Sequence, residues 1–244
     1  MPGDDTHLLL RAFCDELARC GMTDACTSPG SRSSPIVLAL ARERRLRTWS
    51  HVDERCAGFF ALGAAKASRR PVAVACTSGT AAAELTPAVH EAREARVPLV
   101  VLTADRPPEL REVGAGQVID QVKLYGSAAK WFFEVGTHDA TPERLRWMRA
   151  LAARAYRTTQ EDRAGVVHLN FPLREPLVPS GELAPDDSGR PDDAPWTAHG
   201  RSELRPDPPA LDALAALVAA RPRGVVVAGR WERGPALGLA AAGL

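Results

Sequence analysis

Several polar residues in the first half of the chain directly follow apolar segments, and the first two are Ser31 and Arg32. They lie in a turn over residues 28–34, and Ser34 followed by Pro35 is a typical start for a helix. A hydroxyl, a guanidinium and a helix amino terminus together suit a carboxylate or a phosphate. The same residues also suit a helix cap beside an exposed arginine, and the local sequence leaves both interpretations open.

Glu54 is a second candidate because it lies in line with an apolar helical stripe. The positions three, four, seven, eight and eleven residues after it are Ala57, Gly58, Ala61, Leu62 and Ala65. An acid at the start of such a face is either a first-turn glutamate that complements the helix dipole or a buried carboxylate kept for chemistry. This stretch alone favours the helix-dipole interpretation.

Two later turns carry further candidates. Residues 77–80 follow the apolar run 72–76, but they lack the lysine and glycine spacing of a phosphate-binding P-loop, so we expect an ordinary strand-to-helix turn there. Arg106 follows the apolar run 99–104 and precedes two prolines, which predicts an arginine held in a stiff loop. The next stretch, 110–125, has poor periodicity and is predicted to be an irregular loop that carries function.

Other common chemistries lack support in the sequence. No metal-binding spacing relates His51, His90, His138 and His168, and we expect no metal ligand in this chain. No G-x-S-x-G nucleophile motif occurs. The absence of a C-x-x-C pair predicts reduced and mostly buried thiols at Cys14, Cys20, Cys26, Cys56 and Cys76.

Alternating strand and helix segments position these candidates. Strands are predicted near residues 25–27, 46–52, 72–76, 99–104, 131–135 and 166–170. Helices are predicted from a Thr6 cap to Gly21, from Ser34 to about Arg45, from Glu54 to before Pro71, from residue 80 to about Ala95, and over residues 142–157. This alternation predicts an α/β fold with a doubly wound, mainly parallel six-stranded sheet and helices on both faces. Ligands of such sheets bind at the carboxyl ends of the strands, where the four candidate turns converge.

The character of the sequence changes after this α/β region. We expect residues 1–176 to form one domain and residues 177–205, rich in Pro, Asp, Gly and Ser, to form a linker. Residues 206–244 contain one predicted helix around Leu211, Leu214 and Leu217 and one predicted strand over 224–229. One helix and one strand bury no core, so this part is predicted to open a second, truncated α/β domain.

Composition excludes several classes of partner. The 244 residues are 45% hydrophobic and 25% charged, and the formal net charge of +1 comes from interspersed basic and acidic residues. This balance argues against binding to nucleic acid or to an anionic membrane. No apolar run approaches the roughly 20 residues that span a bilayer, and residues 1–6 lack the features of a signal peptide. We therefore expect a cytoplasmic protein.

Five segments together resemble one enzyme family: residues 28–35, 51–55, 74–80, 102–110 and 114–117. They are similar to the amino-terminal pyrimidine-binding domain of the thiamine-diphosphate enzymes, and specifically to the branch that acts in menaquinone biosynthesis. The resemblance covers residues 8–176, and residues 224–230 resemble the start of the central domain in that family. Gly116 departs from the pattern, because asparagine is expected before the glutamine.

The resemblance implies a cofactor, two substrates and roles for individual residues. Glu54 would hydrogen-bond N1′ of the thiamine diphosphate aminopyrimidine and activate the cofactor, which would decarboxylate 2-oxoglutarate and join the product to isochorismate. Cofactor contacts are implied for Glu54, Pro29 and Gln117. Substrate contacts are implied for Ser31, Arg32, Arg106 and Gln117.

The resemblance also implies that this chain is only part of the catalytic unit. The pyrophosphate-binding domain, which holds Mg²⁺ and the diphosphate, has no counterpart among the 244 residues, and in the family the site forms between two subunits. We therefore expect a homo-oligomer, a dimer or a tetramer, and no activity from this chain alone. The alternatives are another thiamine-diphosphate carboligase of the acetolactate synthase type and a non-catalytic flavodoxin-like binding domain.

Overall fold

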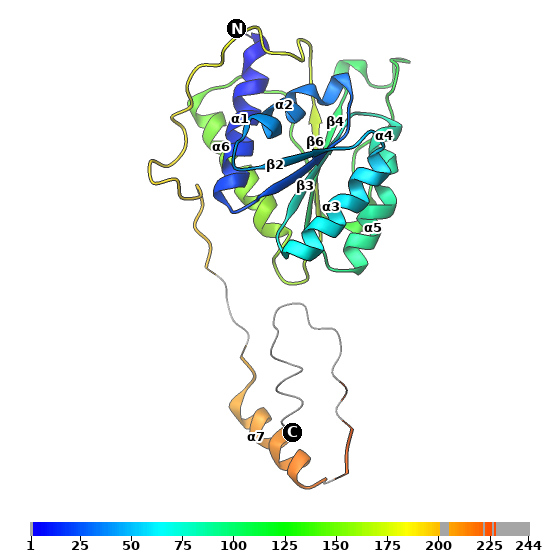
Figure 1. Ribbon diagram of the computed structural model, residues 1–244, viewed down its shortest axis with the longest axis vertical. Coiled ribbons are helices and arrows are strands. Elements are labelled where there is room, and N and C mark those ends of the chain that lie inside the picture. Colours follow the sequence, from blue (N-terminus) through cyan, green and yellow to red (C-terminus); the bar gives the residue numbers. More distant parts are fainter. Residues whose placement is uncertain (1, 201–204, 222, 226, 228–244) are drawn as a thin grey trace. The chain divides into compact units, whose positions relative to one another are not determined.

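The computed structural model describes residues 2–200, 205–221, 223–225 and 227, and the chain forms two compact units, Met1–Ala198 and His199–Leu244 (Figure 1). The first unit contains the sheet and the candidate site. The described residues of the second unit contain one helix, α7 (Pro208–Ala219). Among the described residues, no helix combines the length and the apolar character that crossing a bilayer requires.

The first unit is built on six parallel strands, which confirms the predicted sheet. The strands are β1 (Asp24–Thr27), β2 (Arg47–Ser50), β3 (Val72–Cys76), β4 (Leu99–Asp105), β5 (Ala129–Glu134) and β6 (Val166–Pro172). Their order in the sheet is β2-β1-β3-β4-β6-β5. From β1 the chain moves to β2 on one side and then returns to β3 on the other side. The direction of winding therefore reverses between β1 and β3, and crevices at such a switch point are where open α/β sheets bind ligands.

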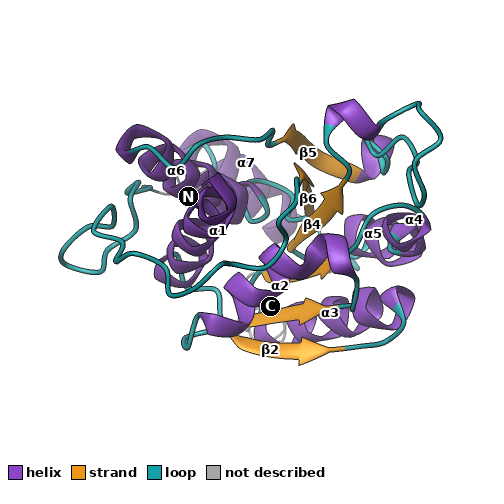
Figure 2. Ribbon diagram, turned by 90° about the horizontal axis from the view of Figure 1, so that it is seen from above, coloured by secondary structure: helices purple, strands orange, loops and turns teal. Residues whose placement is uncertain are grey.

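Helices cover both faces of this sheet (Figure 2). The helices of the first unit are α1 (Pro2–Arg19), α2 (Ser34–Arg42), α3 (Glu54–Ser68), α4 (Thr80–Glu84), α5 (Thr86–Glu94) and α6 (Pro142–Thr158). α1, α2 and α6 share one buried cluster with the sheet, and α3 and α5 share the other. Alternate residues of each central strand face the two clusters, which explains why these strands are apolar throughout. In β4, for example, Val100 and Leu102 face α1 whereas Leu99 and Val101 face α5.

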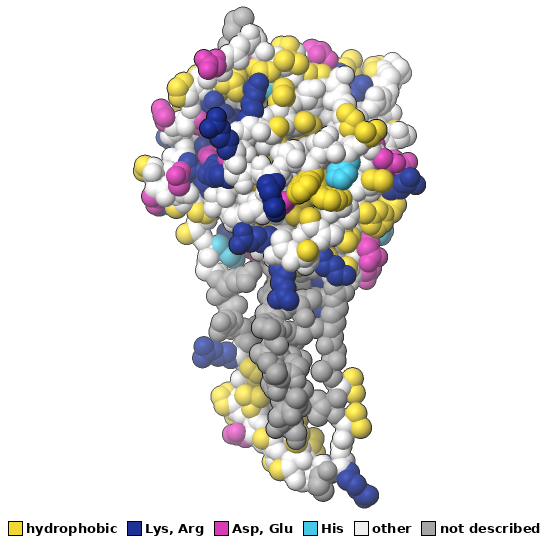
Figure 3. Space-filling model, viewed as in Figure 1, with side chains coloured by type: hydrophobic (Ala, Val, Ile, Leu, Met, Phe, Trp, Pro, Cys, Tyr) yellow, Lys and Arg dark blue, Asp and Glu magenta, His cyan; other side chains and the backbone are white. Residues whose placement is uncertain are grey.

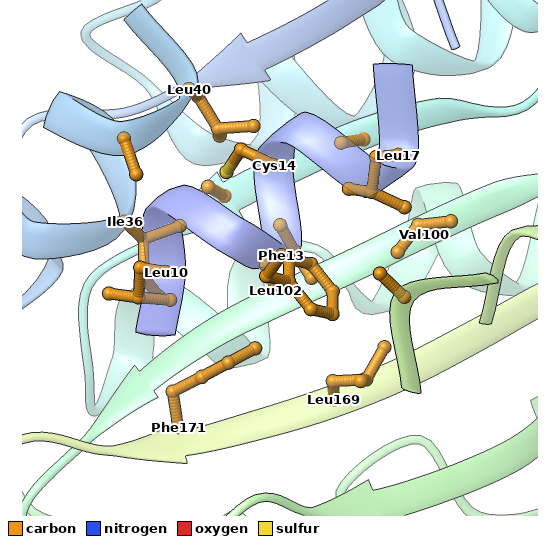
Figure 4. Packing of buried hydrophobic residues seen from close by; sticks show 14 of the residues in the cluster. Leu10, Phe13, Cys14, Leu17, Ile36, Leu40, Val100, Leu102, Leu169 and Phe171 are labelled. Carbon is orange, nitrogen blue, oxygen red and sulfur yellow. The ribbon is translucent and has the colours of Figure 1, made fainter. Parts of the chain in front are cut away.

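The cluster under α1 is the larger one, and aromatic and aliphatic side chains interlock in it (Figure 4). The Phe13 ring of α1 meets the Phe171 ring of β6 edge to face, with centroids 5.6 Å apart. Leu10, Leu17, Ile36 and Leu40 surround this pair from α1 and α2. This packing fixes α1 and α2 on the sheet, and α2 begins directly after the turn that carries Ser31 and Arg32.

Three predicted helix boundaries are wrong. α1 begins at Pro2 instead of after Thr6, and α2 ends at Arg42 instead of near Arg45. The helix predicted from residue 80 to Ala95 is two helices that break at Leu85. Pro87 explains the break, because it lacks the N–H that would continue the hydrogen-bond ladder. Of the strand predicted over 224–229, the described positions have no strand, and residues 226, 228 and 229 lie outside the described part.

Residues 177–198 follow β6 and lie on α1 and α6 of the first unit. Arg149 of α6 donates to Asp186 Oδ2 at 2.7 Å and to Ser188 Oγ at 2.9 Å. The Trp196 backbone N–H donates to Glu16 Oε1 of α1 at 2.5 Å. This segment, rich in proline and polar residues, is therefore held by contacts of its polar groups with two helices.

Candidate active site

Glu54 is the first residue of α3 and directly follows β2. The N-cap is its neighbour Asp53, whose Oδ1 accepts a hydrogen bond from Cys56 N at 3.1 Å. The Glu54 side chain is half-buried and forms no hydrogen bond or ion pair with any described residue. Because Asp53 caps the helix, the carboxylate of Glu54 is left available for a ligand.

Small residues hold α3 close to its neighbours and so fix the position of Glu54. Ala57, Gly58, Ala61 and Ala65 are buried, as the periodicity predicts. A Cβ atom on Gly58 would lie 2.9 Å from the Cβ of Ala88 in α5, so a side chain there would push the helices apart.

Cys76, the last residue of β3, lies within electrostatic reach of Glu54. Burial is the main cause that raises the pKa of the Cys76 thiol, and the negative charge of Glu54 raises it further. The thiol is therefore neutral at physiological pH and is not an activated nucleophile. This relation also places Glu54 beside the carboxyl end of β3, next to the switch point of the sheet.

The turn after β1 passes very close to the end of β3. A Cβ atom on Gly30 would lie 2.4 Å from Thr77 Cβ, so only glycine allows this approach. Ser28 is 1% exposed, and its Oγ has no hydrogen-bond partner among the described residues. A buried hydroxyl without a partner at a strand end is unusual and marks a position where a ligand or water would complete its bonding.

Arg32 and Arg106 share one corner of the site, although they follow different strands. Arg32 donates to the Leu173 carbonyl at 2.8 Å and lies 3.3 Å from the exposed carboxylate of Glu175. Arg106 donates from Nη1 to Ser78 Oγ. Burial lowers the pKa of the Arg106 guanidinium, and the positive charge of Arg32 lowers it further. An anion bound here would relieve the repulsion between these two cations.

Gln117 lies over the turn that follows β3, in the irregular loop predicted from the sequence. Its Nε2 donates to the Ser78 carbonyl at 2.9 Å, and Ser78 Oγ lies 3.2 Å from the Gln117 carbonyl oxygen. Gly79 has a φ of +81°, and a Cβ atom there would lie 2.8 Å from Gln117 Cγ. The turn over residues 77–80 is thus a strand-to-helix turn, as expected, and it also connects Gln117 to Arg106 through Ser78.

A buried polar network lies beneath this corner, and the sequence analysis missed it. Gln121 Oε1 accepts from Gly79 N at 2.8 Å, and its Nε2 donates to Ala104 O at 3.1 Å and to Asn170 Oδ1 at 2.9 Å. Asn170 Nδ2 in turn donates to Asp105 Oδ2 at 2.9 Å. These bonds join the ends of β3, β4 and β6. The available clue was a polar residue, Asn170, at the end of an apolar strand.

The predicted site residues fall into a connected group and a separate one. Hydrogen bonds connect Arg106 and Gln117 through Ser78, and electrostatic coupling connects Arg32 to Arg106. Pro29 and Ser31 are exposed on the turn after β1, and no described side chain bonds to the Ser31 hydroxyl. A Cβ atom on Gly116 meets nothing within 4 Å, so the asparagine expected there would have room.

These features fit the pyrimidine part of thiamine diphosphate. The carboxylate of Glu54, unpaired among the described residues, suits a ring nitrogen that carries a proton, and the buried Ser28 hydroxyl at the end of β1 is a further polar atom without a partner there. The glycines at positions 30 and 79 let the backbone approach closely at the switch point. Among the described residues, no group of three or more His, Cys, Asp or Glu side chains is arranged to hold a metal ion.

Comparison with known proteins identifies the class. Residues 9–124 match the family described as thiamine pyrophosphate enzyme, N-terminal TPP binding domain. Over these residues the chain matches the thiamine-diphosphate enzymes, and it corresponds to the amino-terminal part of its longer relatives.

Three relatives of this chain carry the name 2-succinyl-5-enolpyruvyl-6-hydroxy-3-cyclohexene-1-carboxylate synthase. The protein of Geobacillus kaustophilus is 49% identical over 231 residues, which cover 94% of this chain and 40% of the relative. That of Roseiflexus castenholzii is 48% identical over 241 residues, covering 95% and 41%. That of Thermobifida fusca is 54% identical over 171 residues, covering 70% and 31%. The chain thus spans about 40% of the length of the first two of these curated relatives.

Proposed function

We propose that this chain supplies the pyrimidine-binding half of the active site of a thiamine-diphosphate- and Mg²⁺-dependent carboligase. The complete enzyme joins 2-oxoglutarate to isochorismate with loss of carbon dioxide and forms the compound for which the relatives are named. The observation that carries the proposal is the half-buried carboxylate of Glu54 next to the switch point, which is unpaired within the described part of the chain and follows a helix cap supplied by Asp53.

Glu54 has the role of holding a proton at one atom of the cofactor. Thiamine diphosphate, when bound, supplies the nucleophilic carbon and the electron sink for decarboxylation of a 2-oxo acid. The Glu54 carboxylate accepts a hydrogen bond from the protonated N1′ of the aminopyrimidine and stabilises the proton there. Pro29 and Gln117 line the same binding region on either side of the β1–β3 switch point.

The arginine corner binds the carboxylates of the substrate. Isochorismate is a dianion, and forked guanidinium groups pair well with carboxylates. We assign this role to Arg32 and Arg106, with Ser31 as a further donor from the same turn and Gln117 as an amide contact. The lowered pKa of Arg106, caused by burial first and by Arg32 second, supports the assignment because two adjacent cations favour an anionic ligand.

The other half of the site, including Mg²⁺ and the diphosphate contacts, comes from a domain outside this chain and from a second subunit. We propose residues 1–176 as the pyrimidine-binding domain, 177–205 as a linker and 206–244 as the start of a central domain. An exposed apolar surface near Glu54 supports a homo-oligomer: it is formed by Trp49, Val52, Phe59 and Phe60 of β2, α3 and the turn between them (Figure 3). Contiguous apolar surface of this kind marks an association site.

The proposal is tested in the complete protein with the variant Glu54→Gln. Glutamine keeps the size of the side chain but removes its charge, and we expect kcat to fall by about 10²–10⁴-fold with 2-oxoglutarate and isochorismate, the range of acid–base contributions. Glu91→Gln, an exposed acid on α5, is the matched control and should keep full activity. Near wild-type activity of Glu54→Gln would disprove the cofactor role.

Two further measurements separate the alternatives. Pyruvate offered in place of 2-oxoglutarate tests the acetolactate-type reaction. A clear preference for pyruvate would show that 2-oxoglutarate is not the substrate. The chain of 244 residues by itself should form no product, since it lacks the other half of the site. Measurable carboligation by this chain alone would contradict the division of the site between domains.

A further inference from the structure

A separate pocket of about 150 Å³ lies on the first unit between α1, α2 and the segment 177–198. It is lined by His7, Arg11, Ala39, Arg42, Glu43 and Leu183. Its volume is well above the ~10–15 Å³ that a single water molecule requires. None of these residues belongs to the candidate active site, so the pocket needs its own explanation.

Two side chains that line the pocket each contain a buried nitrogen without a hydrogen-bond partner among the described residues. His7 is 3% exposed, and its Nε2 is buried without a hydrogen bond to any described residue. The Nε of Arg11 is likewise buried and unpaired, although Arg11 Nη2 donates to the Ala184 carbonyl at 2.5 Å. Buried polar atoms almost always find a partner, so a ligand or water would complete the bonding of these two nitrogens.

The charges around the pocket favour an anion. The guanidinium of Arg42 forms no hydrogen bond or ion pair within the described part of the chain. Burial lowers the pKa of the His7 imidazole most, and the charge of Arg42 lowers it further, whereas the carboxylate of Asp4 raises it. Glu43 is the acidic residue of the lining, but its carboxylate is already bound by Arg45, at 2.8 Å from Nε and 2.7 Å from Nη2. Two arginines thus remain to compensate a bound negative charge.

We propose that this pocket binds a small phosphate-bearing molecule, with the phosphate between His7, Arg11 and Arg42. The donors come from two helices, with His7 and Arg11 in α1 and Arg42 at the end of α2. A phosphate has acceptor oxygens in several directions, whereas a carboxylate accepts within one plane. Leu183 belongs to the segment that follows the sheet domain, so an occupied pocket connects that segment to α1 and α2.

The test measures binding of inorganic phosphate to the chain by calorimetry and thermal unfolding, at constant ionic strength maintained with chloride. We expect saturable binding and a rise in Tm for the wild type. The variant Arg42→Ala should bind at least about tenfold more weakly, as loss of one charge-assisted contact implies. Arg44→Ala removes an exposed arginine two residues away that does not line the pocket, and it should bind like the wild type.

Three outcomes would overturn the proposal: no saturable binding of phosphate, equal weakening in Arg42→Ala and Arg44→Ala, or preferential binding of malonate over phosphate. Circular dichroism of each variant verifies folding, and Arg42 is exposed, so its truncation leaves the core intact. A second variant, His7→Phe, fills the pocket with an apolar ring and should abolish the Tm shift. The test requires no catalysis, so its result is independent of the function proposed above.

Discussion

One buried arginine of the first unit and the pair of arginines in the candidate site differ in how their positive charge is compensated. Arg149 of α6 is 1% exposed and is surrounded by the carboxylates of Asp15, Glu16 and Asp186. Arg32 and Arg106 at the strand ends are held mainly by the Leu173 carbonyl and the Ser78 hydroxyl, with one exposed carboxylate, Glu175, beside Arg32. The first arginine is neutralised by the protein itself, whereas the second pair leaves positive charge for a ligand.

The pKa values of Arg149 and Arg106 are shifted in opposite directions. Burial alone would lower the pKa of Arg149, but its bonds to Asp15 and the nearby charge of Asp186 raise it overall. For Arg106, burial lowers the pKa and Arg32 adds to this effect, and the nearby charges of Asp105 and Glu175 do not reverse it. A structural arginine therefore stabilises the fold, while the arginines of the site lie close together at the expense of stability, which is typical of ligand-binding sites.

The largest effect is expected from removing the structural arginine. Arg149→Met leaves buried carboxylates without their main partner and should lower the free energy of unfolding by about 3–5 kcal/mol. Denaturant unfolding of the chain measures this value. Arg146→Ala, an exposed arginine on the same helix, is the control and should change it by less than about 0.5 kcal/mol. A loss of stability below about 1 kcal/mol for Arg149→Met would contradict the structural role of this arginine.

Removing an arginine of the site should lower the activity of the enzyme without lowering the stability of the chain. Arg106→Ala is expected to lower kcat/KM of the complete enzyme by about a hundredfold, because a buried charged contact to the substrate is lost. The stability of the chain should stay the same or rise, since Arg32 loses a like-charged neighbour. Steady-state kinetics with each substrate varied in turn, together with unfolding curves, provide both values. A large loss of stability without a kinetic effect would reverse the assignment.

The carboxylate network around Arg149 also predicts a pH dependence. Burial tends to raise the pKa of Asp15, but its bonds to Arg149 and Arg45 lower it overall. A carboxyl group with a lowered pKa in the folded state stabilises the fold above its unfolded pKa and loses this contribution as pH falls below about 4. Unfolding curves between pH 6 and pH 3 should therefore show a smaller loss of stability for Asp15→Asn than for the wild type. Parallel curves would contradict this.

The smallest effect is expected at Gly116, where the family pattern has asparagine. The variant Gly116→Asn has room for its side chain, and the free energy of unfolding should change by less than about 0.5 kcal/mol. The new amide lies next to Gln117 in the loop, so KM for isochorismate should fall by less than about tenfold. Destabilisation beyond 1 kcal/mol would show that the loop requires glycine at this position.

Much of the fold and part of the site were predictable from the sequence. Continuous apolar runs such as residues 72–76 and 99–104 fixed the central strands, because a strand buried on both faces has no polar side. Periodicity placed Glu54 at the start of the buried face of α3, and this is confirmed. The break between α4 and α5 was missed because the effect of Pro87 was outweighed by the apolar pattern around it.

The network of Gln121 and Asn170 was not predictable in the same way. Each residue alone is an ordinary polar side chain in a loop or at a strand end. Their hydrogen bonds form because β3, β4 and β6 end side by side. Local patterns contain no information on which strands become neighbours, so the support beneath Gly79 and Ser78 emerged only from the tertiary structure.

The sequence by itself therefore determined the class of fold, the turns that carry the site residues and the family, since spacing along the chain records these features. The tertiary structure decided which of those residues become neighbours and which have hydrogen-bond partners. The strand order brings Arg32 and Arg106 into one corner, and because Asp53 forms the cap, Glu54 has no partner among the residues that the structure describes. The physical reason is that charge compensation and hydrogen-bond pairing depend on distances across the sheet, which only the folded chain defines.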